Sequence, residues 1–528
     1  MNFWKRSIRQ VRPVHRDPAR SRRAPSRSCR LQLEDLEGRA LLSTWTLAEY
    51  LDASSARHVV EQFNNSPPSD ITITGNPTPT FVLNTESAVP DTVYIQNTSA
   101  GVPIKINGHN QDTINLGSAG SVQGFLAPVT LDNPSSHNTI WIFDDANPTA
   151  RTATLFTSTP GWGEVAGLAP APIIYNYDNT SSVNIVTGTG NDTVNVQATG
   201  APTFITNRGY DMVNVGNAGT VQGIHGALSI SNPPLANTIT INDSTDPTAR
   251  TATLFTSTPG WGEVAGLAPA PIIYNYDDTS SVNIVTGTGN DTVNVAGTGA
   301  TTYITGHGYD TVNVGTSGTV QGIHGSLFVN DKLFVNKINI DDSADAVPRT
   351  ATLSTYTHGW GEVSGLAPAP IIYNYATTSS MNLTTNTAGD TIDVWATGVA
   401  TYISTPKTGT YGGFDTVNIG YEGTVQGIHG PLYISNRPNY TAVNINDWTD
   451  TGERHASLGS LLLGPDYRTW GSIGGLAPVA INFVWNDMYH HQVNVSAPLG
   501  GNISWTVNPD AYESAVGVYV LLDGSNIN

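Results

Sequence analysis

The feature that most constrains this chain is an internal repeat with a fixed period of 99 residues. The string GWGEVAGLAPAP begins at Gly161 and again at Gly260, and GWGEVSGLAPAP begins at Gly359. The phrase TVQGIHG keeps the same step and recurs once more at Thr424, where an insertion stretches a fourth copy. A fixed period of this kind means that each copy folds as one unit that stacks on, or is strung beside, its neighbours.

Within one copy, short stretches alternate apolar and polar residues and are separated by Gly, Asn, Asp or Pro, which predicts many short strands. In DTVNV (192–196) the two valines would face one way, with Thr and Asn facing the other. The phrase returns as DMVNV (211–215) and more loosely as NTITI (237–241). These spacings of about 19 to 26 residues suit one coil of a solenoid.

The sequence therefore predicts an all-β fold, an elongated parallel β-solenoid (β-helix) of about four 99-residue repeats with several coils in each. The alternative is four tandem β-sandwich domains, because 99 residues is also the length of one sandwich. Echoes within the copy and the lack of a clear linker between copies favour the solenoid.

Four regions follow along the chain: a basic leader with a sorting motif at 1–43, an N-terminal cap at 44–90, the repeat array at 91–495 and a C-terminal cap at 496–528. Solenoids cover their exposed strand edges with non-repeating ends. In the first cap, Val59, Val60 and Phe63 fall on one face of a predicted helix that begins at Ser54 or Ser55.

Charge is distributed unevenly and limits the partners. The first 43 residues hold 11 of the 23 Lys and Arg but only 4 of the 42 Asp and Glu, which leaves an acidic body. Such a body disfavours nucleic acid and favours cations or simple solubility. Cys29 is the only cysteine, so neither disulfides nor a thiolate zinc site hold the body together. No run of about 18 apolar residues predicts a transmembrane helix.

Two parts of the sequence resemble proteins of planctomycetes. The segment LQLEDLEGRALLS (31–43) follows a basic arm and resembles the LExLExRxLLS-type motif of large surface or secreted proteins, which implies export or sorting. The repeat body is similar to long β-strand-repeat proteins that share the phrases GLAPAPI and GNDTVNV, which implies an extracellular or surface-associated solenoid without a known activity. The residues that carry the first resemblance are Leu33, Glu34, Leu36, Glu37, Arg39, Leu41, Leu42 and Ser43.

A further motif predicts calcium. TGTGNDTVN (187–195 and 286–294) and TGHGYDTVN (305–313) resemble the calcium-binding nonapeptide of toxin-type repeat proteins, which implies carbonyl and carboxylate oxygen ligands. The candidate calcium ligands are Gly188, Gly190, Asp192, Asp211, Gly287, Gly289, Asp291, Gly306, Gly308 and Asp310. In the motif that contains Asp211, Asn207 replaces the first glycine and would preserve a left-handed turn.

The other interpretation is a tight corner at which each Asp accepts backbone N–H bonds, because the motifs come in pairs and then break for some 80 residues.

The remaining polar groups recur from copy to copy, whereas an active site is normally built once. Asp246 and Arg250, which recur as Asp345 and Arg349, predict ion pairs or a turn clamp. The sequence therefore predicts a non-enzymatic extracellular or cell-surface structural or adhesive protein, stabilised by calcium, with cell-envelope or extracellular glycans or proteins as partners. The alternative is a carbohydrate-binding or carbohydrate-cleaving β-helix, for which a row of repeated tryptophans could stack on sugar rings.

Overall fold

The computed structural model describes residues 43–527, except for 53–55, 65, 74–79, 86–88, 234, 316, 406–413, 437–438, 463–468, 497–502, 508–518 and 524–525. The described residues belong to one compact unit and form strands joined by turns. Two single-turn 3₁₀ helices, η1 (Tyr375–Thr377) and η2 (Trp485–Asp487), interrupt them.

The strands form two sheets of 23 and 20 strands. In spatial order, sheet A contains β3 (Ser69–Ile73), β2 (Arg57–Phe63), β1 (Ser43–Leu51), β5 (Asp91–Ile95), β7 (Thr113–Leu116), β9 (Asn138–Phe143), β13 (Thr180–Val186), β15 (Thr203–Thr206), β17 (Leu228–Ser231), β21 (Ile272–Asn275), β20 (Trp261–Ala265), β19 (Thr251–Thr258), β23 (Thr292–Val295), β25 (Thr311–Val314), β27 (Asn336–Asp341), β31 (Thr378–Thr384), β33 (Ala400–Ser404), β35 (Leu432–Ser435), β39 (Ile481–Val484), β38 (Thr469–Gly474), β37 (Arg454–Leu462), β41 (Ile503–Val507) and β43 (Asn526–Ile527). Sheet B contains β4 (Phe81–Asn84), β6 (Ile104–Asn107), β8 (Val129–Asp132), β12 (Ile173–Asn176), β11 (Trp162–Ala166), β10 (Thr152–Thr159), β14 (Thr193–Val196), β16 (Met212–Val215), β18 (Asn237–Asn242), β22 (Thr279–Val285), β24 (Thr301–Gly306), β26 (Leu327–Asp331), β30 (Ile371–Asn374), β29 (Trp360–Ser364), β28 (Thr350–Thr357), β32 (Thr391–Val394), β34 (Asp415–Ile419), β36 (Thr441–Asn446), β40 (Met488–Ser496) and β42 (Tyr519–Asp523).

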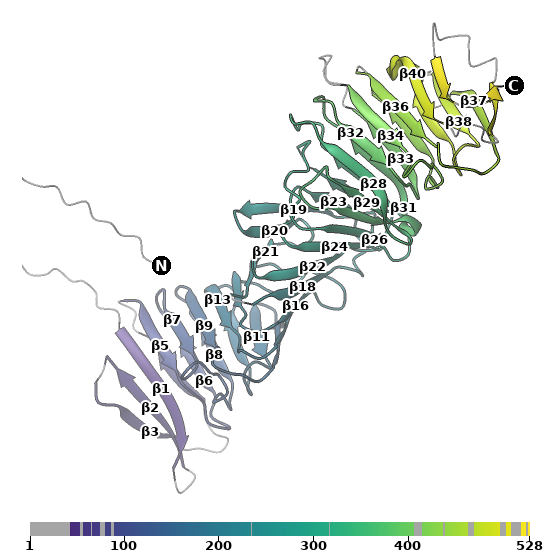
Figure 1. Ribbon diagram of the computed structural model, residues 1–528. Helices are drawn as coiled ribbons and strands as arrows, with labels where there is room; N and C mark the ends of the chain where they lie inside the picture. The colour runs from purple at the N-terminus through teal and green to yellow at the C-terminus, as the bar shows by residue number, and fades with distance from the viewer. Residues whose placement is uncertain are drawn as a thin grey trace, which may run out of the picture. The chain divides into compact units, whose positions relative to one another are not determined.

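The two sheets define a parallel β-solenoid, because the chain visits them alternately and each strand pairs in parallel with the one a coil later. Asn195 of β14 lies opposite Asn214 of β16, which lies opposite Thr240 of β18. These partners are the three related phrases in the sequence, so the predicted coil is confirmed. The alternative of tandem β-sandwich domains is wrong, since both sheets continue through all the copies (Figure 1).

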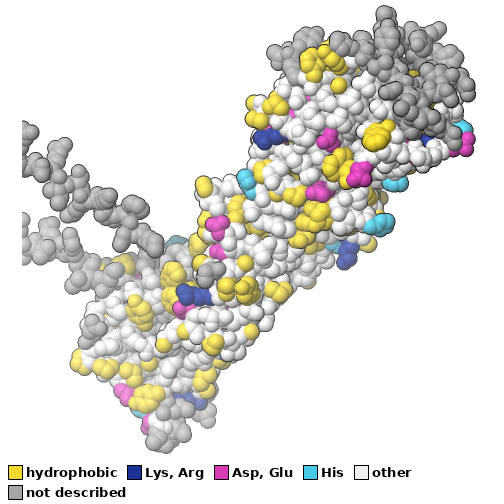
Figure 2. All heavy atoms as spheres, viewed as in Figure 1, with side chains coloured by type: hydrophobic (Ala, Val, Ile, Leu, Met, Phe, Trp, Pro, Cys, Tyr) yellow, Lys and Arg dark blue, Asp and Glu magenta, His cyan; other side chains and the backbone are white. Residues whose placement is uncertain are grey.

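Inward and outward side chains stack separately along the coils. Val194, Val213 and Ile239 occupy successive inward positions and are fully buried, so the apolar ladder forms a continuous core. Outward asparagines form a second ladder, in which Asn313 donates to Asn294 Oδ1 at 2.9 Å and accepts from Asn339 Nδ2 at 2.7 Å. On the face seen in Figure 2, uncharged polar groups and backbone surround scattered apolar and charged side chains.

One segment of every repeat departs from the parallel arrangement. Strands β10, β11 and β12 form an antiparallel meander, which joins β14 on one side and β8 on the other. The phrase GWGEV makes the first turn and the second strand of this meander. The sequence predicted only parallel coils here, because strand direction leaves no mark on an alternating pattern of such short strands.

The meanders alternate between the two sheets. Those of β10–β12 and β28–β30 lie in sheet B, whereas those of β19–β21 and β37–β39 lie in sheet A. Between successive meanders the chain passes six single strands, so one repeat spans three and a half coils. Equivalent residues in adjacent repeats therefore lie on opposite sheets, and they return to the same sheet every second repeat.

The chain ends also differ from the prediction. Residues 57–63 form strand β2, not a helix, because they pair antiparallel with β1 and β3 and bury Val59. Parallel coil pairing already begins at β4, within the predicted first cap, and continues through β41–β43 within the predicted second cap. Within the described ranges no helix has the length and apolar content needed to cross a bilayer.

Candidate functional site

The predicted calcium motifs lie at coil corners, where each Asp accepts a backbone N–H bond from the preceding coil or meander, and Asp192, Asp211 and Asp291 also accept one from their own corner. Asp192 Oδ1 accepts from Arg151 N at 2.6 Å, and its Oδ2 accepts from Gly188 N at 3.0 Å. Asp211 Oδ1 accepts from Asp192 N at 2.6 Å, and its Oδ2 accepts from Gly209 N at 3.2 Å. The structure thus brings the two predicted carboxylates together in one ladder.

The next repeat builds the same corner. Asp291 accepts from Arg250 N at 2.6 Å and from Gly287 N at 2.8 Å. Asp310 accepts from Asp291 N and from the Thr286 hydroxyl, both at 2.8 Å. Because the carboxylate oxygens already hold backbone donors, the geometry favours the interpretation of these Asp residues as corner clamps. Calcium at these corners stays a prediction.

The glycines of the motif are required by close contact between coils. A β-carbon on Gly188 would strike the carbonyl oxygen of Asn147, and one on Gly209 would strike that of Gly190. Gly287 and Gly308 lie equally close to backbone oxygens of adjacent coils, and Gly190 and Gly289 lie against backbone atoms of the preceding segment. The prediction of a left-handed residue at Asn207 is wrong, because the described non-glycine residues with positive φ do not include it.

Burial sets the electrostatics of the corners. It is the largest cause that raises the pKa values of Asp192, Asp211 and Asp291 above the ordinary range. The same cause raises the pKa of Asp310 to about 6. Backbone N–H bonds oppose this effect at every corner, since they stabilise the ionised carboxylate.

The fourth repeat keeps the same corner although its glycine pattern differs. Asp390 Oδ1 accepts from Arg349 N at 2.7 Å, and its Oδ2 accepts from Asn386 N at 3.1 Å. Asn386 takes the place of the first glycine of the motif. The signal was present in the 99-residue spacing between Asp291 and Asp390, which the changed glycine pattern obscured.

The repeated Asp–Arg groups are ion pairs, as their recurrence predicted. Arg250 donates from both Nε and Nη2 to Asp246 Oδ2 at 2.9 Å. Arg349 donates from Nε to Asp345 Oδ2, and Arg454 donates from Nε to Asp450 Oδ2, both at 2.8 Å. Each of these guanidinium groups therefore links the two ends of a short turn through its ion pair.

The repeated tryptophans do not form one row. Trp162 and Trp360 lie in sheet B, whereas Trp261 and Trp470 lie in sheet A. Because one repeat spans three and a half coils, the tryptophans of successive repeats lie on opposite sheets.

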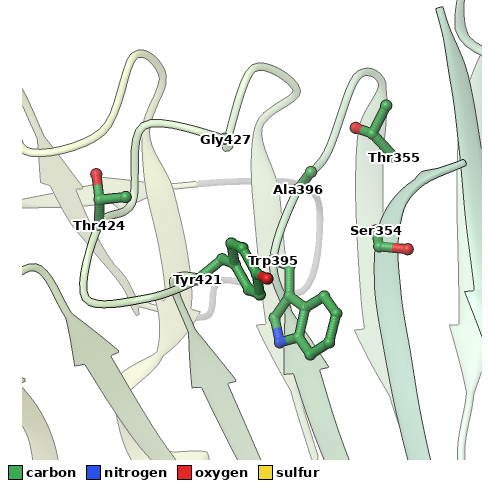
Figure 3. Close-up of a pocket in the computed structure, with 7 residues that line it drawn as sticks. All are labelled: Ser354, Thr355, Trp395, Ala396, Tyr421, Thr424 and Gly427. Carbon is green, nitrogen blue, oxygen red and sulfur yellow. The ribbon is translucent and has the colours of Figure 1, made fainter. Parts of the chain in front are cut away.

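A groove that sequence reasoning missed holds a different aromatic pair. It has a volume of about 440 Å³ and exposes Trp395 and Tyr421, whose rings lie 4.8 Å apart (Figure 3). Two repeats earlier, on the same sheet, a groove of about 370 Å³ has Gln197 and Asn217 at these positions. The signal available in the sequence was the appearance of two aromatic residues at positions where the other repeats have small or polar residues.

The other predicted residues can be placed only in part. In the sorting motif, Leu33 to Leu42 lie outside the described residues, and Ser43 begins β1 and is buried. Among the described residues, no cluster of three or more His, Cys, Asp or Glu side chains is arranged to hold a metal ion. No protein-family model matches the chain, and no curated protein is detectably similar to it.

Proposed function

We propose that this protein is a non-enzymatic structural or adhesive protein that acts outside the cell or at its surface. The observation that carries the proposal is the use of the recurring polar side chains. The corner carboxylates of Asp192 and Asp291 bind backbone N–H groups, and the Asp246 and Asp345 carboxylates bind arginine. Groups engaged in this way support a rigid scaffold, and each repeat presents its outer surface again.

An external location draws its support from the sequence. The basic leader and the segment 31–43 resemble an export or sorting signal. Limited proteolysis of intact cells that make the full chain tests this location. Loss of the chain from intact cells supports the proposal, whereas loss only after lysis contradicts it.

Binding of carbohydrate in the Trp395–Tyr421 groove is a second candidate function. Exposed aromatic rings supply flat apolar faces on which sugar rings stack, and Ser354, Thr355 and Thr424 add hydroxyl groups around them. A glycan array with the full chain tests this function, and a reducing-sugar assay on any bound glycan tests for cleavage.

The second repeat supplies the substitutions that test the groove. Trp395→Gln and Tyr421→Asn install the residues that the equivalent groove carries as Gln197 and Asn217, so we expect the variants to fold. Binding that these variants abolish would assign glycan recognition to the groove. Binding that they leave unchanged would remove the groove from consideration.

A further inference from the structure

A cluster of buried oxygen atoms in the third repeat has no counterpart with the same charge in the other repeats. At Gly306, the three atoms nearest to the position of an added β-carbon, none farther than 2.9 Å, are Asp331 Oδ2, Asp310 Oδ2 and Asn336 Oδ1. The three side chains belong to residues that are only 1–2% exposed. Two carboxylate oxygens and one amide oxygen therefore converge on the same small space.

The orientation of these side chains is fixed by their other bonds. Asp331 Oδ1 accepts from Leu333 N at 2.9 Å and from Phe334 N at 2.7 Å, which turns Oδ2 toward Gly306. Asn336 donates from Nδ2 to the carbonyl oxygen of Asn330 at 2.8 Å, which directs its Oδ1 into the cluster. Within the described part of the chain, neither Asp331 Oδ2 nor Asn336 Oδ1 has a hydrogen-bond partner.

The same place in the second repeat has one carboxylate, Asp211, in place of two, and amide donors beside it. Asn207 stands in place of Gly306, and its Nδ2 donates to Asn237 Oδ1 at 2.7 Å. Asn232 stands in place of Asp331, and its Nδ2 donates to the same oxygen at 3.1 Å. Amide groups therefore fill the space that the third repeat lines with oxygen.

The first and fourth repeats follow the second. Asn133 occupies the position of Asp331 and donates to Asn138 Oδ1 at 3.0 Å. Asn436 occupies it in the fourth repeat and donates to Asp415 Oδ2 at 3.3 Å. In each of these three repeats an asparagine N–H₂ group donates to a neighbouring side-chain oxygen at the position where the third repeat has the Asp331 carboxylate.

The third repeat has an aspartate where the others have this donor. The Thr286 hydroxyl donates to Asp310 Oδ2, but Asp331 Oδ2 and Asn336 Oδ1 have no partner among the residues that the structure describes. Among the described residues, no Lys, Arg or His forms an ion pair with Asp310 or Asp331. Buried acceptors and like charges in one space are costly unless a cation or a proton joins them.

We propose that this cluster binds one divalent cation, for which calcium is the best fit, in the third repeat alone. Calcium prefers hard oxygen ligands, both carboxylate and amide carbonyl, and tolerates irregular geometry. The lack of a side chain at Gly306 leaves the oxygens unobstructed. Of the predicted calcium motif, only Gly306 and Asp310 take part, whereas Asp331 and Asn336 come from the next coil.

Titration of the full chain with calcium after chelator treatment tests the site. Calorimetry at pH 7.5 should show one binding event per chain, and the melting temperature should rise with calcium. Asp331→Asn places at this position the residue of the other three repeats, so we expect this variant to fold and to lose the calorimetric signal. Asp345→Asn is the matched control, because it removes a carboxylate of the same repeat at a position where the first repeat has Asn147.

Two results would overturn the proposal. A calcium response that survives unchanged in Asp331→Asn would place the ion elsewhere. No response up to millimolar calcium, together with a higher melting temperature of Asp331→Asn at pH 7.5, would show that Asp310 and Asp331 share a proton. Neither result bears on the proposed surface role, which is tested by location.

Discussion

The parallel coils and the antiparallel meanders repeat in different ways. Among the coil strands, β14, β16 and β18 carry DTVNV, DMVNV and NTITI at equivalent positions, so that the pattern is kept while the letters change. The meander occurs once in each repeat and keeps its letters between repeats, since GWGEVAGLAPAP is identical in the copies that begin at Gly161 and Gly260, as the coil segment TGTGNDTVN also is at 187–195 and 286–294. The difference teaches which physical demand each region satisfies.

A coil strand needs only inward apolar side chains, whereas a meander needs particular small residues. A β-carbon on Gly262 would strike the rings of Tyr274 and Tyr276, and one on Gly299 would strike the ring of Tyr276 from the next coil. Gly266 has φ of +82°, and its added β-carbon would strike the Thr251 carbonyl oxygen. Several aliphatic residues meet the first demand, but only glycine meets the second.

The largest single effect is expected in a coil core. Ile239→Ala leaves a cavity at a fully buried position and should lower the free energy of unfolding by about 3 kcal/mol. Thr240→Ala, outward on the same strand, should change it by less than about 0.5 kcal/mol. Urea unfolding measures both. Equal effects would mean that the inward ladder does not carry the stability of the coils.

Two meander glycines separate backbone strain from close contact. Gly266→Ala should cost about 2–3 kcal/mol, because it combines a positive φ with a steric clash against Thr251. Gly260→Ala has a similar φ of +86° but nothing within 4 Å, so we expect about 1 kcal/mol. Thermal unfolding of the pair measures the difference. A Gly266→Ala variant as stable as Gly260→Ala would contradict the contact argument.

A smaller effect is expected from the outward ladder of the coils. Asn313→Ala removes the bonds to Asn294 and Asn339, and because the ladder is partly exposed the loss should be about 1 kcal/mol. Thr311→Ala, on the same face of β25, is the control and should be close to neutral. Chemical denaturation distinguishes them, and a neutral Asn313→Ala would show that the ladder orders side chains without stabilising the fold.

The smallest effect per residue is expected from pH, and it comes from coil corners. Burial raises the pKa values of Asp310, Asp342, Asp415 and Asp447 to about 6, above the value of 3.8 for an unperturbed Asp. The folded chain therefore holds more protons than the unfolded chain between about pH 4 and 6, and stability falls as pH rises through this window. In calcium-free buffer the melting temperature should rise by a few degrees from pH 7.5 to 5.5. A fall over this range would contradict the assignment of these carboxyls as buried and under-solvated.

The coil could be predicted from the sequence, but the meander and the oxygen cluster could not. The spacing of DTVNV, DMVNV and NTITI equals the number of residues in one coil, because inward Val and Ile residues must recur at the same position of each stacked coil. Strand direction in β10–β12 depends on the geometry of the turns between short strands. The alternation of apolar and polar residues is the same in parallel and antiparallel strands, so it does not predict this direction. The cluster at Gly306 joins two coils. Asp331 and Asp310 are separated in the sequence by a turn of variable composition, and only the folded coil places their carboxylates side by side.

The half-coil in each repeat also fixes which changes in copy number the molecule can accept. Loss or gain of a single repeat would rotate every later segment by half a turn, so a groove such as that of Trp395 would move to the opposite sheet. A change of two repeats would leave every later surface on its original side. A partner that binds one side of the solenoid would therefore tolerate the gain or loss of repeats only in pairs.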